Sequence, residues 1–124
     1  MIPNNPIFNL ISAGVGTTTK IVSLNLKGLL VLVNIPVAAG GTSPTLQVTI
    51  NGIVPDGSGA TFPLLASAAL DATTTGVTSL TVFPGAATTT NLSANALITS
   101  SVSITVVVGG TSPSVTATIS IQGI

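Results

Sequence analysis

The chain has 124 residues, of which 3% are charged and 2% are aromatic, and it contains neither cysteine nor histidine. Soluble domains usually carry about 25% charged residues, so uncharged polar and small side chains must form most of this surface. Two lysines and two aspartates give a net charge of zero, which excludes the basic footprint that holds nucleic acid. The length suits one domain.

Neither a membrane span nor a secretory signal is evident. The most apolar run, residues 29–39, is interrupted by Asn34 and Pro36 and is well short of the roughly 20 residues that a spanning helix needs. Residues 1–6 lack the basic and apolar regions of a signal peptide. We therefore expect synthesis in a cytoplasm and no membrane partner.

The N-terminal third predicts three strands. Residues 1–16 are expected to form an extended arm or edge strand, with Ile7–Ile11 as its strand, ahead of a single β-sandwich domain at 17–124. Thr17–Leu26 alternates and predicts a strand. Leu29–Ile35 is almost entirely apolar, which predicts a strand that is buried on both faces and ends at Pro36.

The pentapeptide Gly-Gly-Thr-Ser-Pro occurs twice, at 40–44 and at 109–113. Each copy follows an apolar run and precedes a run that alternates between apolar and polar residues. Glycine permits positive φ, and proline cannot donate a ladder hydrogen bond, so each copy is predicted to be the tight connection of a β-hairpin. Two similar hairpins are expected to form the framework of the fold.

Alternation in the strands predicts a core and an outer face. The predicted core residues are Val48, Ile50, Leu80, Val106, Val115 and Ile119. The outward positions are uncharged: Thr45, Gln47, Thr49 and Asn51 in one strand, and Ser114, Thr116, Thr118 and Ser120 in another.

The segments between the two pentapeptides predict shorter elements. They are a turn at Val54–Gly59, strands at Thr61–Ala66 and Val77–Phe83, an ambiguous stretch at Ala68–Thr75, and a loop at Ala86–Ala96 with one possible helical turn at Ser93–Leu97. About eight short strands predict an all-β antiparallel sandwich, immunoglobulin-like or jelly-roll-like. The short connections favour the immunoglobulin-like order.

The sequence offers little chemistry. Without His, Cys, Tyr, Trp or Arg, the common general bases, thiol nucleophile, zinc ligands and anion clamp are missing. Asp56 and Asp71 are interpreted as turn residues rather than as a glycosidase pair, and Asp56-Gly57-Ser58 offers too few oxygens for calcium. We expect no catalytic, cofactor-binding or metal-binding residues and no enzymatic activity.

Several short motifs are also interpreted as structural. Gly14-Val15-Gly16 and Gly57-Ser58-Gly59 lack the lysine and helix of a phosphate loop. Asn91-Leu92-Ser93 matches a three-residue glycosylation sequon, but such short matches are common by chance and no export signal supports this one. The Thr triplets at 17–19, 73–75 and 88–90 are interpreted as β-favouring polar surface rather than as an ice-binding array.

Four stretches together resemble a family of small virion proteins of tailed bacteriophages. They are residues 27–34, 41–48, 80–85 and 109–114, and the similarity extends from about Lys20 to the C-terminus. The resemblance implies a structural, decoration-type role on the outer capsid surface, with the major capsid protein and copies of the chain itself as partners. The alternative is a β-sandwich adhesin or fibre module that binds a cell-surface glycan.

Overall fold

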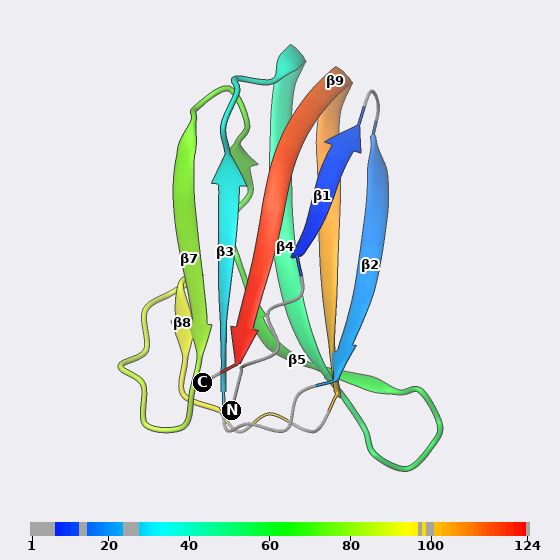
Figure 1. Ribbon diagram of the computed structural model, residues 1–124, viewed down its shortest axis with the longest axis vertical. Helices are drawn as coiled ribbons and strands as arrows, with labels where there is room; N and C mark the ends of the chain where they lie inside the picture. Colours follow the sequence, from blue (N-terminus) through cyan, green and yellow to red (C-terminus); the bar gives the residue numbers. More distant parts are fainter. Residues whose placement is uncertain (1–6, 13–14, 24–27, 97, 99–100, 124) are drawn as a thin grey trace.

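The computed structural model describes residues 7–12, 15–23, 28–96, 98 and 101–123 (Figure 1). These residues form strands and loops without a helix, which confirms the all-β class. The strands are β1 (Ile7–Ser12), β2 (Gly16–Ser23), β3 (Leu29–Ile35), β4 (Gly40–Ile53), β5 (Thr61–Ala66), β6 (Leu70–Asp71), β7 (Gly76–Val82), β8 (Ser93–Ala94) and β9 (Ser101–Gly123). No described segment is an apolar helix of membrane-crossing length.

The 23-residue strand β9 is the centre of the sheet. Strands β3 and β4 follow it antiparallel along one edge, from Leu29↔Gly123 to Gly52↔Val102. Strands β1 and β2 follow its other edge, from Ile7↔Ser120 to Ser23↔Ser101. The first half of β9 therefore lies between β2 and β4, and the second half lies between β1 and β3.

The two pentapeptides lie inside β4 and β9 and pair with each other, with Gly40↔Ser114, Thr42↔Thr111 and Thr45↔Gly109 as Cα partners. Breaks in the register on both sides of Thr42 mark the place where the sheet bends over, at the upper end of Figure 1. The prediction of two local hairpins is therefore wrong. Leu46 pairs with Val108 of β9, 62 positions away, and not with a strand close to it in the sequence, as the hairpin prediction required.

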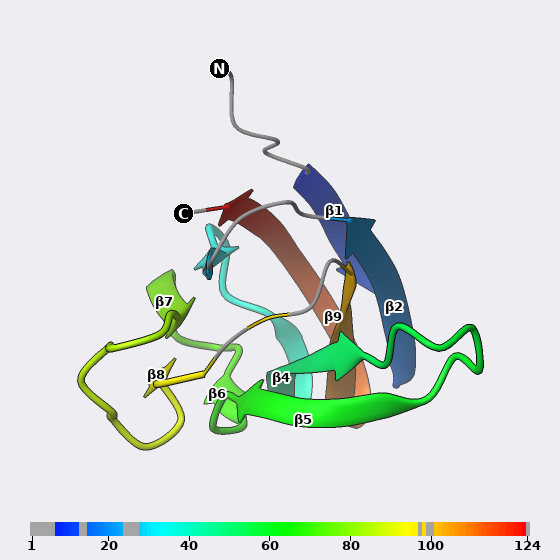
Figure 2. The same ribbon diagram turned by 90° about the horizontal axis from the view of Figure 1, so that it is seen from below.

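Short strands extend the sheet on the far side of β3 and β4. Strands β5 and β6 pair with β4, and β7 pairs with β3. Strand β8 pairs with β7 in parallel. Because β5 also approaches β7 and β8, the bent sheet is nearly closed and barrel-like (Figure 2).

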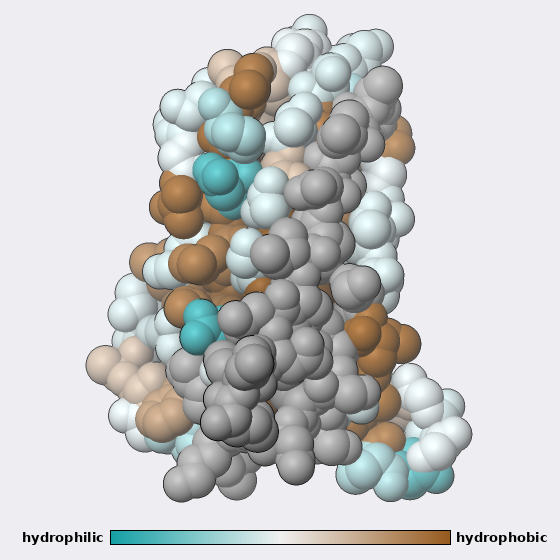
Figure 3. All heavy atoms as spheres, viewed as in Figure 1, coloured by the Kyte–Doolittle hydropathy of each residue, from teal (hydrophilic) through white to brown (hydrophobic). Residues whose placement is uncertain are grey.

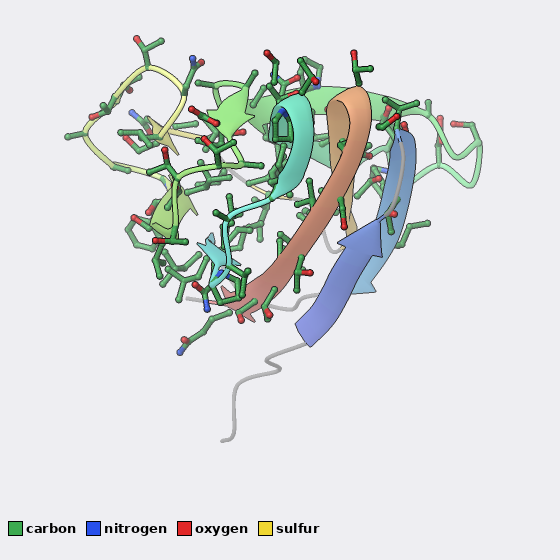
Figure 4. The ribbon with its side chains drawn as sticks, turned by 90° about the horizontal axis from the view of Figure 1, so that it is seen from above. Atoms are coloured by element: carbon green, nitrogen blue, oxygen red, sulfur yellow. The ribbon has the colours of Figure 1, made fainter. Side chains whose placement is uncertain are left out.

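The core lies inside this bend and combines residues from both halves of the sheet. All six predicted core residues are buried: Val48, Ile50, Leu80, Val106, Val115 and Ile119. Viewed from the bent end, the ribbon curls around space that side chains occupy (Figure 4). Burial of this kind is the main driving force for folding.

Three details differ from the sequence-based expectations. Strand β3 is buried on one face only, with Leu30 and Leu32 half-buried and Asn34 exposed, because its outer face has no covering layer in the described structure. Ser93–Ala94 forms a short strand where a helical turn was possible, and residue 97 lies outside the described residues. Thr45, Gln47, Thr49 and Asn51 are half-buried rather than fully outward.

Candidate functional site

The two aspartates adopt the same local geometry. The Asp56 Oδ1 accepts hydrogen bonds from the Ser58 N–H at 2.9 Å and the Ser58 hydroxyl at 2.6 Å. The Asp71 Oδ1 accepts equivalent bonds from Thr73, at 3.0 and 2.6 Å. The side-chain bonds, followed by the backbone bonds, lower the pKa of each carboxyl below its usual 3.8 because they stabilise the ionised form.

The fold keeps these carboxylates apart. Asp71 pairs with Thr45, within the first half of β4, whereas Asp56 lies in the turn that follows Ile53 at the end of that strand. Thr45 and Ile53 are eight positions apart along β4, which corresponds to roughly 26 Å at about 3.3 Å per residue. A hydrolytic carboxylate pair requires about 5–10 Å. Each aspartate therefore organises its own turn.

A shallow hollow of about 340 Å³ lies beside the second Thr triplet. Its lining residues are Ile35, Leu70, Asp71, Thr74, Thr75, Gly76, Val77 and Thr78. Asp71 is the charged group among them, and its Oδ1 is already bonded to Thr73. In the described part of the chain, no three acidic, histidine or cysteine side chains gather as metal ligands. Proton transfer here would depend on one exposed carboxylate.

The more extensive feature is an uncharged outer surface. On the half of the sheet that contains β3, the outward rows are Thr118–Asn34–Val77, Ser120–Leu32–Ser79 and Gln122–Leu30–Thr81. On the other half, the rows are Thr17–Val107–Gln47, Thr19–Thr105–Thr49 and Ile21–Ser103–Asn51. Ser103, at the centre of the last row, is buried, with 8% of its surface exposed. None of these eighteen residues is charged. We call the two sets together the neutral faces.

Apolar side chains protrude from the neutral faces. Ile21 is 64% exposed, Val77 is 65% exposed, and Val107 is also exposed. The molecular surface on the side of β3 and β7 mixes pale and brown residues with few strongly hydrophilic ones (Figure 3). The alternation of β7 already placed Val77 with Ser79 on the outer face, but the sequence analysis did not single it out as an exposed apolar residue.

The described phenylalanines lie against glycines. The ring of Phe62 covers Gly52 on the neighbouring strand, and Phe83 lies against Gly28. A glycine leaves room for the ring at each place, and both rings are half-buried. They therefore help to fill the structure and do not form a flat, exposed stacking platform. Phe8 has its backbone in β1, and its side chain lies outside the described part.

The remaining motifs are placed in turns and loops. Gly57-Ser58-Gly59 belongs to the β4–β5 turn and leads into a strand, not a helix. The sequon asparagine, Asn91, has a φ of 62° in the β7–β8 loop. The hydroxyl of Ser93 accepts from the Thr89 N–H and donates to the Ala87 carbonyl, so it closes this loop. The Thr triplets lie in β2, before β7 and in the β7–β8 loop, which separates them in the fold.

Comparison with known proteins gave no match among family models, curated proteins or solved structures.

Proposed function

We propose that this chain is a non-enzymatic structural protein of a tailed-bacteriophage virion that decorates and stabilises the outer capsid surface. The observation that supports the proposal best is the composition of the neutral faces, because none of their eighteen residues is charged. The resemblance of the sequence to small virion proteins supplies the location. In this proposal the two halves of the bent sheet act as the layers of a sandwich, each with a face for a neighbour.

Neutral faces suit repeated, weak docking. A contact between uncharged residues strips water from few ions, so it avoids the desolvation cost of buried charge. The β-branched side chains, such as Thr105, Thr118 and Val107, lose little rotamer freedom when a partner covers them. Many such contacts on a symmetric shell add up through multivalency. The partners in this proposal are the major capsid protein and further copies of the chain.

The placement of the aromatic residues favours docking to protein over binding to a glycan. Carbohydrate-binding modules use exposed aromatic rings with one apolar and one wet side. Phe62 and Phe83 instead lie against Gly52 and Gly28. This leaves the described surface without an aromatic platform, so the adhesin or fibre alternative has less support.

The test is to purify the phage particles whose genome encodes the chain and to detect it in them by mass spectrometry and electron cryomicroscopy. The expected result is density for the β-fold on the outer capsid lattice. Binding of purified protein to undecorated heads should then change little between 0.1 and 1 M salt, about a threefold change in Debye length. Absence from particles, or specific binding to a glycan array, would contradict the proposal.

A further inference from the structure

The chain contains two copies of one sequence pattern, in the same order. Phe8-Asn9-Leu10 matches Phe62-Pro63-Leu64, Thr17–Thr19 matches Thr73–Thr75, and Ser23-Leu24 matches Ser79-Leu80. The two pentapeptides follow, and after them Ile50-Asn51-Gly52-Ile53 matches Ile121-Gln122-Gly123-Ile124. We call residues 7–53 the first module and residues 61–124 the second module. Internal repeats of this kind indicate that one supersecondary unit occurs twice.

Equivalent segments have equivalent roles in the sheet. In the repeat, β5 corresponds to β1, and β4 corresponds to the second half of β9. Strand β1 pairs with the second half of β9, and β5 pairs in the same way with β4. Likewise, β7 corresponds to β2, and β3 corresponds to the first half of β9. Strand β2 pairs with the first half of β9, and β7 pairs with β3. The correspondence of sequence therefore extends to the pairing of every long strand.

The contacts at the bend are reciprocal. A Cβ on Gly41 would meet the Ser112 carbonyl oxygen at 2.5 Å, and one on Gly110 would meet the Ser43 carbonyl oxygen at 2.7 Å. Their φ angles are 99° and 113°, and those of Ser43 and Ser112 are 48° and 47°. Gly40 corresponds to Gly109 in the repeat, and Thr45 corresponds to Ser114. Replacing each residue by its counterpart therefore turns the pair Gly40↔Ser114 into the pair Thr45↔Gly109. A local two-fold axis therefore passes close to the Thr42↔Thr111 pair.

The modules are interleaved rather than side by side. Across the sheet the order is β1–β2, then β9, then β3–β4, then β5–β7, so strands of the two modules alternate. The ladder between β9 and β3–β4 joins the modules, and both contribute to one core. This is the arrangement of a strand-exchanged dimer whose two subunits are joined in one chain.

The covalent link between the modules is the turn at residues 54–60. It is closed by the Val54 N–H bond to the Ala60 carbonyl at 2.8 Å and by the bonds of Ser58 to Asp56. Gly57 and Gly59 have φ angles of 82° and 79°, and nothing lies within 4 Å of the Cβ that either would carry. The turn thus directs β5 back along β4 but contributes little to the interface between the modules.

We propose that the module interface also fits the complementary module of a second copy of this chain, which gives a closed, strand-exchanged dimer. In that dimer, β4 of one copy pairs with β5 of the other, and the first module of each copy packs against the second module of its partner. The contacts are those that already join the modules within one chain. The turn at 54–60 selects the monomer because it allows the second module to fold back, and exchange of identical elements is a low-cost route to dimers.

The main test removes residues 54–60 from the full chain. Ile53 and Thr61 face each other across the β4–β5 ladder, and a direct peptide bond between them leaves no residue for the turn. We expect the deletion variant to have native β-sheet circular dichroism and twice the monomer mass by light scattering. The matched control inserts seven Gly and Ser residues between Gly57 and Ser58. It should remain a monomer because lengthening a flexible loop adds little to the entropy cost of closing it.

A mixing experiment separates strand exchange from surface association. Dimers of ¹⁵N-labelled and unlabelled deletion variant should give no mixed species by native mass spectrometry until they are unfolded and refolded together. The unaltered chain, refolded at high concentration, should give a dimer fraction that persists after dilution, and the insertion control should give less. A deletion variant that folds as a monomer, fails to fold, forms open polymers or exchanges subunits without unfolding would overturn the proposal. This outcome is independent of capsid binding.

Discussion

Thr42 and Thr111 face each other across the β4–β9 ladder, and each is the third residue of the same pentapeptide. Around this pair the backbones of the two pentapeptides approach so closely that glycine is required beside both threonines. Gly41 and Gly110 have positive φ and lie against the carbonyl oxygens of Ser112 and Ser43. The repeated pentapeptide thus fits a backbone-to-backbone contact at the bend of the sheet.

The first prediction concerns these glycines. Gly41→Ala and Gly110→Ala should each lower the free energy of unfolding by about 2–5 kcal/mol, of which the positive φ accounts for roughly 1–2 and the contact with backbone for roughly 1–3. Gly57→Ala is the matched control, since its φ is positive but the space around it is open. It should cost only the φ contribution, about 1–2 kcal/mol. Urea unfolding of the three variants tests this, and equal losses would contradict it.

The second prediction concerns the core. Ile119 is fully buried in the second half of β9, so Ile119→Ala should lower the free energy of unfolding by about 2–4 kcal/mol through lost burial and a cavity. Thr116→Ser, at an exposed position of the same strand, should change it by less than about 0.5 kcal/mol. Thermal or denaturant unfolding measures both. A loss below 1 kcal/mol for Ile119→Ala would show that the site collapses around the smaller side chain.

The third prediction concerns pH. Side-chain bonds from Ser58 and Thr73 lower the pKa of Asp56 and Asp71 in the folded state, so their stabilising effect is present above the usual carboxyl pKa. It is lost as the pH falls through the lowered folded values. Stability should therefore be nearly flat between pH 5 and 8 and should decline only under acid conditions. Unfolding curves from pH 2 to 8 test this.

The matched variants for the acid decline are Asp56→Asn and Asp71→Asn. Each should flatten part of the decline and leave the fold unchanged. Because both carboxylates are fully exposed, solvent screening keeps each effect small. A strong pH dependence of stability between pH 5 and 8, where neither carboxyl titrates, would contradict the assignment.

The fourth prediction concerns docking. Thr118 lies on a neutral face beside Asn34, and Thr118→Arg would place a charge where the proposed contact excludes water. We expect this variant to keep its circular dichroism and Tm within a few degrees but to lose binding to undecorated heads at least tenfold, about 1.4 kcal/mol. Ala60→Arg, in the exposed β4–β5 turn, is the control and should bind normally, because only backbone atoms of Ala60 take part in the hydrogen bonds of the turn. Equal binding by both variants would remove Thr118 from the contact.

The sequence alone determined the local structure of this chain. The alternation of Leu46, Val48 and Ile50 identified a buried face, and the same period identified Val115 and Ile119, because a strand alternates its side chains between two faces. Asp56 beside Gly57 identified a turn for an equally local reason. The near-absence of charge likewise identified the neutral character of the outer faces.

Only the tertiary structure decided which strands pair. Leu46 pairs with Val108, and Val33 pairs with Ile119. These residues are far apart in the sequence, and the alternation within each strand does not specify which residues of another strand it faces. The two pentapeptides satisfied the local requirements of hairpin turns, namely glycine flexibility and a proline without a donor. In the fold, the two pentapeptides instead pair with each other, and the same glycine flexibility and missing proline donor serve the bend of the sheet. Local chemistry fixed the conformations available to these residues, and the shared core of the two modules selected among them.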